Sequence, residues 1–178
     1  MDSGRVSMRY ARAIYEFARD NKEENRLYEE MKTLIHSYSL FPSMTKIMED
    51  PTIQAEVKKK TLTIAAGITV SDSFGKALDL ILKRKREKYL LFISLMYQDY
   101  YRKKKGIVSG QLLTTEPVNI ETQDRLKELI RKTSQKEPDF VNLTDSSIIG
   151  GFVLELDFNL LDASIRGQLN RIKSELYK

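Results

Sequence analysis

The residue combinations that bind nucleotides are incomplete in this chain. A phosphate-binding loop needs GxxxxGK[ST], in which backbone amides surround phosphate oxygens and a hydroxyl holds magnesium. Residues 75–76 are Gly-Lys, but Ala77 follows where the hydroxyl residue is required. The paired Gly150 and Gly151 precede a predicted strand, whereas the glycines of a dinucleotide fingerprint follow one. The sequence therefore predicts neither type of nucleotide site.

A metal or acid–base site would depend on His36, which is the single histidine of a chain without cysteine. Zinc sites use Cys and His ligands before carboxylates, and no helix predicted around His36 places two acidic residues beside it. We expect His36 to lie on the surface or at the boundary of its helix. No nucleophile with a neighbouring base is evident, so the sequence predicts no catalytic residue, no metal and no cofactor.

Three basic clusters offer another kind of chemistry, namely Lys58 to Lys60, Lys83 to Lys88 and Arg102 to Lys105. Beside tyrosines such as Tyr97 and Tyr101 they could bind RNA or DNA through phosphate contacts and stacking. Alternatively, they place cations at helix ends, where the negative pole of the helix dipole is offset. Two of the clusters lie near predicted helix termini, which favours the second interpretation, and the tyrosines fall within an apolar run typical of core.

A strip of small residues beside an aromatic, formed by Tyr10, Ala11 and Ala13, lies in the first predicted helix. Such a strip either lets a neighbouring helix of the same protein approach closely or leaves a shallow groove for a foreign amphipathic helix. The residues alone favour the internal role.

Composition indicates a soluble globular protein with one larger domain or two small ones. The chain has 178 residues, of which 41% are hydrophobic and 31% charged, and a formal net charge of +5. Residues 1–105 carry 21 basic and 14 acidic side chains, and residues 106–178 carry 9 and 11. This asymmetry suggests different partners for the two parts. No stretch approaches the ~20 apolar residues that span a bilayer, so we expect contact with a membrane only through another protein.

The pattern of residues 1–105 predicts a compact bundle of six helices joined by short connections. The first helix presents an apolar side that we expect to include Val6, Tyr10, Ala13, Ile14, Phe17 and Ala18. Asp50 followed by Pro51 predicts the start of the fourth helix, with Ile53, Val57 and Ile64 inward, and Gly67 its end. Ser71 predicts the start of the fifth helix, in which Phe74, Ala77, Leu78 and Ile81 recur at helical spacing.

Residues 106–178 predict a small α+β domain, so the fold class is α+β. We expect a strand over residues 107–115 with Val108 and Leu112 on one face, and a helix over residues 120–134 with Leu126, Leu129 and Ile130 inward. A second strand over residues 140–144 would place Val141 and Leu143 together. A domain of about 70 residues has a marginal core.

The closing segment, residues 150–176, is the most regular part of the sequence. Phe152, Leu154 and Leu156 alternate with other residues, which predicts a strand with one apolar face. After a turn at residues 157–159, Asp162 or Ser164 can cap a helix. That helix carries an apolar stripe at i, i+4, i+7 and i+11, made of Ile165, Leu169, Ile172 and Leu176. Regular structure without reactive groups indicates a docking surface.

Two motifs give the chain a resemblance to a known family. RYARAIYEFA (residues 9–18) and IIGGFVLELDFNLLDASIRGQLNRIKSEL (residues 148–176) resemble the two ends of the delta subunit of bacterial F-type ATP synthase, the family of the mitochondrial oligomycin-sensitivity-conferring protein. The second motif is the more specific, and the resemblance covers essentially the whole chain. Its residues are Gly150, Gly151, Asp162, Ser164, Arg166, Gly167 and Leu169. The chain departs from the family at Asp157 and Ala163, where glycine is usual.

The resemblance implies a stator subunit without catalysis of its own and without a cofactor. Such a subunit joins the catalytic head to the peripheral stalk, on the cytoplasmic face of the inner (plasma) membrane, so that rotation is coupled to ATP synthesis and hydrogen ion transport. The bundle, residues 1–105, would receive the amino-terminal helix of an alpha subunit between its first and fifth helices. The small domain, residues 106–178, would meet the b subunits.

Carried onto this sequence, the resemblance implies a groove wall made of Tyr10, Ala11, Ala13, Ile14 and Phe17. Helical periodicity predicts Ala77, Leu78 and Ile81 for the opposite wall. The glycines and polar residues of the second motif are expected to shape the fold of the small domain. A basic helical protein that binds nucleic acid is the alternative function, and it depends on the Lys83 to Lys88 cluster.

Overall fold

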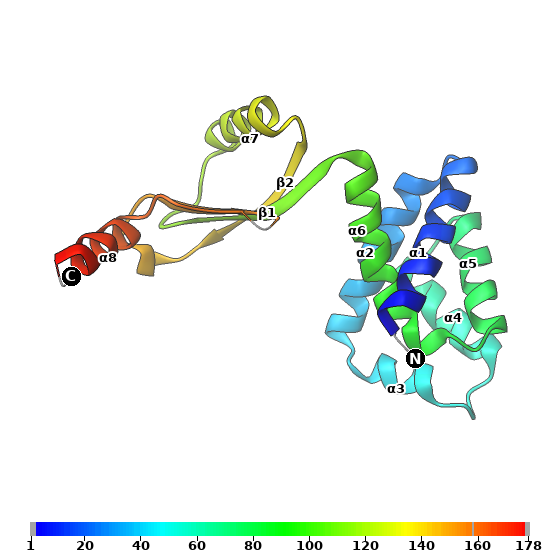
Figure 1. Ribbon diagram of the computed structural model, residues 1–178. Coiled ribbons are helices and arrows are strands. Elements are labelled where there is room, and N and C mark those ends of the chain that lie inside the picture. The colour runs from blue at the N-terminus through cyan, green and yellow to red at the C-terminus, as the bar shows by residue number, and fades with distance from the viewer. Residues whose placement is uncertain (1–2, 158, 177–178) are drawn as a thin grey trace. The chain divides into compact units, whose positions relative to one another are not determined.

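The computed structural model describes residues 3–157 and 159–176. Its contacts divide the chain into two compact units, Met1–Tyr101 and Arg102–Lys178. The first unit is helical and the second combines a four-stranded sheet with two α-helices (Figure 1). The α+β class and the order of a helical bundle followed by a small α+β unit are confirmed.

In the described part of the chain, six α-helices lie in or begin in the first unit. They are α1 (Ser3–Asp20), α2 (Glu24–Leu40), α3 (Ser43–Glu49), α4 (Ala55–Ala66), α5 (Asp72–Lys83) and α6 (Leu90–Lys105). A 3-10 turn, η1 (Glu87–Tyr89), precedes α6. Helix α1 packs on α2 and α5, and α2 also packs on α4. Because the connections are short, successive helices fold back on one another.

The core of the bundle joins aliphatic side chains to a group of tyrosines. Leu27, Leu34 and Ile81 are fully buried, as is Tyr97. Tyr28 and Tyr101 stack with ring centroids 4.2 Å apart, and the Tyr101 hydroxyl donates a hydrogen bond to Asn25 Oδ1 at 2.9 Å. Buried tyrosines need such a partner for the hydroxyl. These rings therefore belong to the core, as the apolar run around them predicts.

Helix α4 begins later than expected and faces the other way. Asp50 Oδ1 accepts hydrogen bonds from the amide and the hydroxyl of Thr52, at 2.8 and 2.7 Å, so the carboxylate closes a local turn. The predicted start at Asp50 and Pro51 is therefore wrong. The predicted inward face is also wrong, because Val57 and Ile64 are exposed while Lys58, Leu62 and Ala66 are buried. The predicted end is confirmed, with Gly67 following the last residue at a φ of 144°.

The second unit is built on a sheet with the strand order β2-β1-β3-β4. The strands are β1 (Ile107–Thr114), β2 (Glu137–Thr144), β3 (Phe152–Leu156) and β4 (Asn159–Asp162). Strand β1 pairs parallel to β2 and antiparallel to β3, and β3 pairs antiparallel to β4. The parallel pair is connected through α7 (Ile120–Ser134), as a crossover requires. A 3-10 turn, η2 (Ser146–Ile148), and α8 (Ile165–Leu176) complete the described part of the unit.

Helix α7 covers one face of the sheet and forms the core of the unit with it (Figure 1). Val108 and Leu112 of β1, Leu154 of β3 and Ile130 of α7 are buried together. The predicted apolar faces of the first and third strands are confirmed, since Phe152 and Leu156 also pack against this cluster. Strand β4 was not expected.

Val141 and Leu143 share one face of β2, as predicted, whereas one residue of α7 points away from its predicted direction. Val141 and Leu143 are exposed, because Phe140 lies opposite Gly110 of β1 and packs under α7, so its neighbours point away from the core. Leu129 is exposed as well, and Ile130 alone of α7 is fully buried. The alternation of residues along a strand does not say which of its two faces is turned to the core. That is decided by the element that covers one face of the sheet.

Candidate partner-binding surfaces

A surface groove lies between α1 and α5 of the bundle. One part of it, a depression of about 250 Å³, is lined by Ala13, Ile14, Phe17, Lys76, Ala77 and Leu80. Phe17 and Leu80 are 39% and 43% exposed, and both line this depression. Exposed apolar residues that line a groove are typical of a site for an amphipathic helix.

Helix α1 serves both the core and the groove because its apolar residues cover a wide arc. Ser7, Ala11, Ile14 and Ala18 recur at i, i+4, i+7 and i+11 and are buried. Tyr10, Ala13 and Phe17 lie on the neighbouring face, which remains partly or fully exposed. Of the expected groove residues of α1, Tyr10, Ala13 and Phe17 are therefore found at the surface, whereas Ala11 and Ile14 are buried, and Ile14 still contributes to the floor of the depression.

Three expected wall residues lie inside the bundle instead. Ala11, Leu78 and Ile81 are 0%, 1% and 0% exposed, so a partner on the surface cannot reach their side chains. Their predicted placement in the groove is therefore wrong, because these side chains pack inside the bundle, where α1 contacts α5. The α5 wall consists of Lys76, Ala77 and Leu80. Ala77 and Leu80 are three residues apart and so lie on one face of α5. The sequence did not distinguish this face from the buried face of Phe74, Leu78 and Ile81, which has the same helical spacing.

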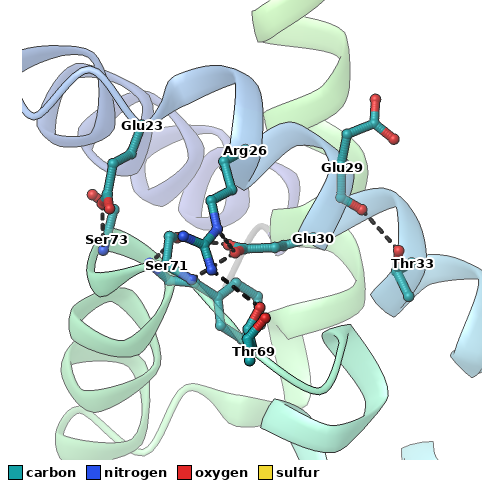
Figure 2. Close-up of polar contacts among 9 residues, drawn as sticks. Glu23, Arg26, Glu29, Glu30, Thr33, Thr69, Ser71 and Ser73 are labelled. Atoms are coloured by element: carbon teal, nitrogen blue, oxygen red, sulfur yellow. Dashed lines mark hydrogen bonds and ion pairs between the residues drawn. The ribbon is translucent and has the colours of Figure 1, made fainter.

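A hydrogen-bonded network fixes the start of α5 and with it the groove (Figure 2). The Glu30 carboxylate of α2 is buried and accepts bonds from the Ser71 amide and hydroxyl, both at 2.6 Å. Arg26 donates to the same carboxylate at 3.2 Å and to the Thr69 carbonyl at 3.2 Å. Ser71 in turn caps α5, since its hydroxyl accepts from the Phe74 amide, as predicted from the sequence. The two charge-assisted bonds from Ser71 to the buried Glu30 carboxylate hold the start of α5 against α2.

In the small unit, the motif glycines lie where other atoms approach closely, side-chain atoms at Gly150 and Gly167 and backbone atoms at Gly151. A Cβ on Gly150 would lie 2.7 Å from Ile165 Cδ1. Gly151 has a φ of 76°, and a Cβ there would strike the Ala163 carbonyl. A Cβ on Gly167 would strike the Asp162 carboxylate. These glycines shape the junction between the sheet and α8.

Asp162 and Ser164 organise the start of α8. The Ser164 hydroxyl donates to Asp162 Oδ1 at 2.6 Å and accepts from the Gly167 amide at 2.9 Å. The Ser164 amide also donates to Asp162 Oδ1 at 2.9 Å. The hydroxyl and amide bonds from Ser164 lower the pKa of Asp162 below its ordinary value. Ser164 is therefore the capping residue, and Asp162 orients it.

The remaining motif residues face outward. Arg166 is exposed, and Leu169 is 53% exposed. The whole predicted stripe of α8 is uncovered, consisting of Ile165, Leu169, Ile172 and Leu176. At the turn before β4, Asp157 has a φ of 50°, the left-handed region in which the family usually has glycine.

The basic clusters have structural roles at several positions. Lys58 is buried, and its ammonium donates to the Met48 carbonyl at 2.8 Å and to Glu87 Oε1 at 2.9 Å. The second and third clusters lie at the C-terminal ends of α5 and α6, as expected. His36 is exposed on α2. Among the described residues, no group of three acidic, histidine or cysteine side chains is arranged to hold a metal.

None of the helices within residues 3–157 and 159–176 is both long and apolar enough to cross a membrane.

Comparisons with known proteins find matches over nearly the whole chain. The family model "ATP synthase delta (OSCP) subunit" matches residues 6–176. The chain is 38% identical to ATP synthase subunit delta of Bacteroides thetaiotaomicron over 177 residues, which cover 98% of this chain and 95% of that protein. It is 37% identical to ATP synthase subunit delta of Azobacteroides pseudotrichonymphae over 180 residues, covering 99% and 100%.

A solved structure shares the fold across nearly the whole length. A chain in the cryo-EM structure of the Toxoplasma gondii mitochondrial ATP synthase hexamer matches with a TM-score of 0.66 at 17% identity, covering 97% of this chain and 98% of that one. The family match spans both units and includes the groove helices and the closing motif. The chain therefore belongs to the ATP synthase delta (OSCP) subunit family.

Proposed function

We propose that the chain is a non-catalytic stator subunit of an F-type ATP synthase. It would join the alpha subunits of the catalytic head to the b subunits of the peripheral stalk, on the cytoplasmic face of the membrane. Holding the head still allows rotation of the central shaft to drive ATP synthesis and hydrogen ion transport. Family membership supports this role over the nucleic-acid alternative.

The observation that carries the proposal is the groove between α1 and α5. Phe17 and Leu80 present apolar surface on either side of Ala13, whose small side chain leaves room for a third helix. A helix laid in such a groove buries an apolar face, and each Å² removed from water contributes about 25 cal/mol before association entropy is subtracted. A subunit that resists torque needs long-lived contacts of this kind.

The α8 stripe and the uncovered sheet face support the second attachment. Leu169 and Ile172 of α8 are exposed, and so are Val141 and Leu143 of β2. These surfaces suit the apolar faces of stalk helices. Two units that each hold a different partner also gain from linkage, because release of one leaves the other bound.

Binding of an alpha-subunit amino-terminal peptide by the full chain tests the groove. Ala13→Arg places a long charged side chain between Phe17 and Leu80, and we expect a loss of affinity of at least about tenfold. Ala55→Arg is the matched control, since Ala55 is an exposed alanine of α4 outside the groove. Isothermal titration calorimetry gives the affinities, and circular dichroism checks the fold. Equal affinities for the two folded variants would contradict the groove assignment.

A further inference from the structure

One end of the groove is strongly cationic. Beyond Leu80 it opens into a depression of about 610 Å³ that includes three guanidinium groups, those of Arg9, Arg84 and Arg86. Arg9 belongs to α1, while Arg84 and Arg86 follow the last residue of α5. Arg5 and Arg12 lie four residues before and three after Arg9, so a basic strip runs along this side of α1.

The carboxylates near this end in sequence are already paired with other cations. Glu87, which follows Arg86, pairs with Lys58 at 2.9 Å, and Asp79 pairs with Lys59. Glu16 of α1 pairs with Arg19 at 2.5 Å. Within the part of the chain that the structure describes, the guanidinium groups of Arg9 and Arg84 form no ion pair. Neither of these two guanidinium groups is therefore neutralised by an ion pair with a described residue.

Helix dipoles account for only part of this charge. Arg84 and Arg86 come after the C-terminal end of α5, where cations are favourable. Arg9 lies in the middle of α1, far from either end, so the dipole offers no reason for its charge. Arg9 is exposed at the edge of the apolar groove, within reach of an occupant of that groove.

The shape and chemistry of the groove favour a helix over a nucleic acid. The depression at the basic end shares Ala13 and Leu80 with the apolar depression around Phe17, so one occupant would contact both. The rise of an α-helix from Arg9 to Phe17 is about 12 Å, which matches two to three turns of an occupant. Among the residues that line the basic depression, Tyr10 is the one aromatic ring, and Tyr97 and Tyr101 are buried in the core, so successive bases would find no row of rings to stack on.

We propose that Arg9, Arg84 and Arg86 select an amphipathic helix that carries carboxylates in the terminal turn lying over them. The apolar part of the groove supplies the burial, and the arginines fix which end of the occupant lies at this end. Charge pairing at the rim of an interface raises the association rate and excludes neutral or basic competitors. This inference rests on the proposed function, since it assigns charge to the helix that the groove receives.

Designed peptides of about 18 residues with one apolar face provide the test, because about five helical turns cover the two to three turns of the groove and extend about one turn beyond each end. One peptide carries three Glu in its first turn, a second carries them in its last turn, and a third has Gln in their place. The full chain is titrated with each peptide at low and high ionic strength. We expect one of the two acidic peptides to bind at least about tenfold more tightly than the neutral one, with the advantage lost at high salt.

The double variant Arg9→Glu with Arg84→Glu assigns the effect to the basic end. It should reduce the affinity for the preferred acidic peptide by at least about tenfold and change that for the neutral peptide by less than about twofold. Lys32→Glu with Lys46→Glu is the control, with the same change in net charge at exposed positions of α2 and α3. It should leave both affinities unchanged.

The outcomes separate the two proposals. If acidic and neutral peptides bind equally and Ala13→Arg weakens both, the charge selection is wrong while the groove assignment stands. If no peptide binds, the groove assignment itself fails. If a single-stranded RNA oligonucleotide binds, loses affinity in the double glutamate variant and is not displaced by the peptides, the basic end is a nucleic-acid site and the proposal is overturned.

Discussion

The helical bundle and the small α+β unit use their apolar residues differently. Among the described residues, 21 apolar side chains are buried in the first unit and five in the second. The bundle thus completes its own core and presents a groove of fixed shape. The small unit leaves the α8 stripe and one face of its sheet uncovered. A completed core forms a binding site before the partner arrives, whereas an incomplete one gains stability from the partner.

The largest effect should come from breaking the sheet of the small unit. Gly110 of β1 faces β3 so closely that a Cβ would strike the Glu155 carbonyl. We expect Gly110→Ala to destabilise the second unit by about 3 kcal/mol or more, since neither strand can move without losing its pairing. Hydrogen exchange followed by mass spectrometry should show loss of protection in β1, β2 and β3 only. Loss of protection in α1 to α5 as well would show that the two units unfold together.

A smaller effect in the bundle should follow Glu30→Gln. The substitution removes the charge that accepts from Ser71 and Arg26, and it turns an amide group toward donors. We expect a loss of about 2 kcal/mol in the free energy of unfolding, with less protection at the start of α5.

Glu29→Gln is the matched control for the Glu30 substitution, because the Glu29 side chain points away from the network (Figure 2). Urea unfolding followed by far-ultraviolet circular dichroism measures both variants. A similar loss of unfolding free energy in the two variants would show that the buried network does not stabilise the start of α5.

Gly75→Ala should make the bundle more stable. Gly75 lies inside α5, has no positive φ, and a Cβ there would meet nothing within 4 Å. Glycine in a helix interior costs about 0.5–1 kcal/mol relative to alanine, so a gain of this size is expected. The contrast with Gly110 separates a glycine required by packing from one that is not. A loss of stability would mean that the two glycines have the same role.

The smallest effect should be a pH dependence confined to the start of α8. The pKa of Asp162 is lower in the folded state, so its contribution is present above the ordinary value of 3.8 and is lost as the pH falls through the lowered value. Chemical shifts of the α8 amides should report this loss. Asp162→Asn should remove it, and an unchanged titration in that variant would assign it to another carboxylate.

The sequence was sufficient for the elements whose signals are local. The Ser71 cap, the end of α4 at Gly67 and the bounds of α7 follow from residues within one turn of each site. The closing segment predicted β3, the cap of α8 and its apolar stripe, because alternation, a capping side chain and helical spacing are all local signals. Its family resemblance is confirmed by the comparisons.

Only the tertiary structure decided which apolar face meets which surface. On α1 the residues from Tyr10 to Phe17 satisfy two helical faces, and packing against α2 and α5 buried Ala11 and exposed Ala13. On β2, α7 covers the face of the sheet that carries Phe140, so Phe140 packs against the core and Val141 is exposed. Local spacing fixes the period of a helix or strand but not its rotation, because rotation is set by neighbours distant in the sequence. The lining of the groove, its cationic end and the exposure of the α8 stripe were therefore decided only by the tertiary structure.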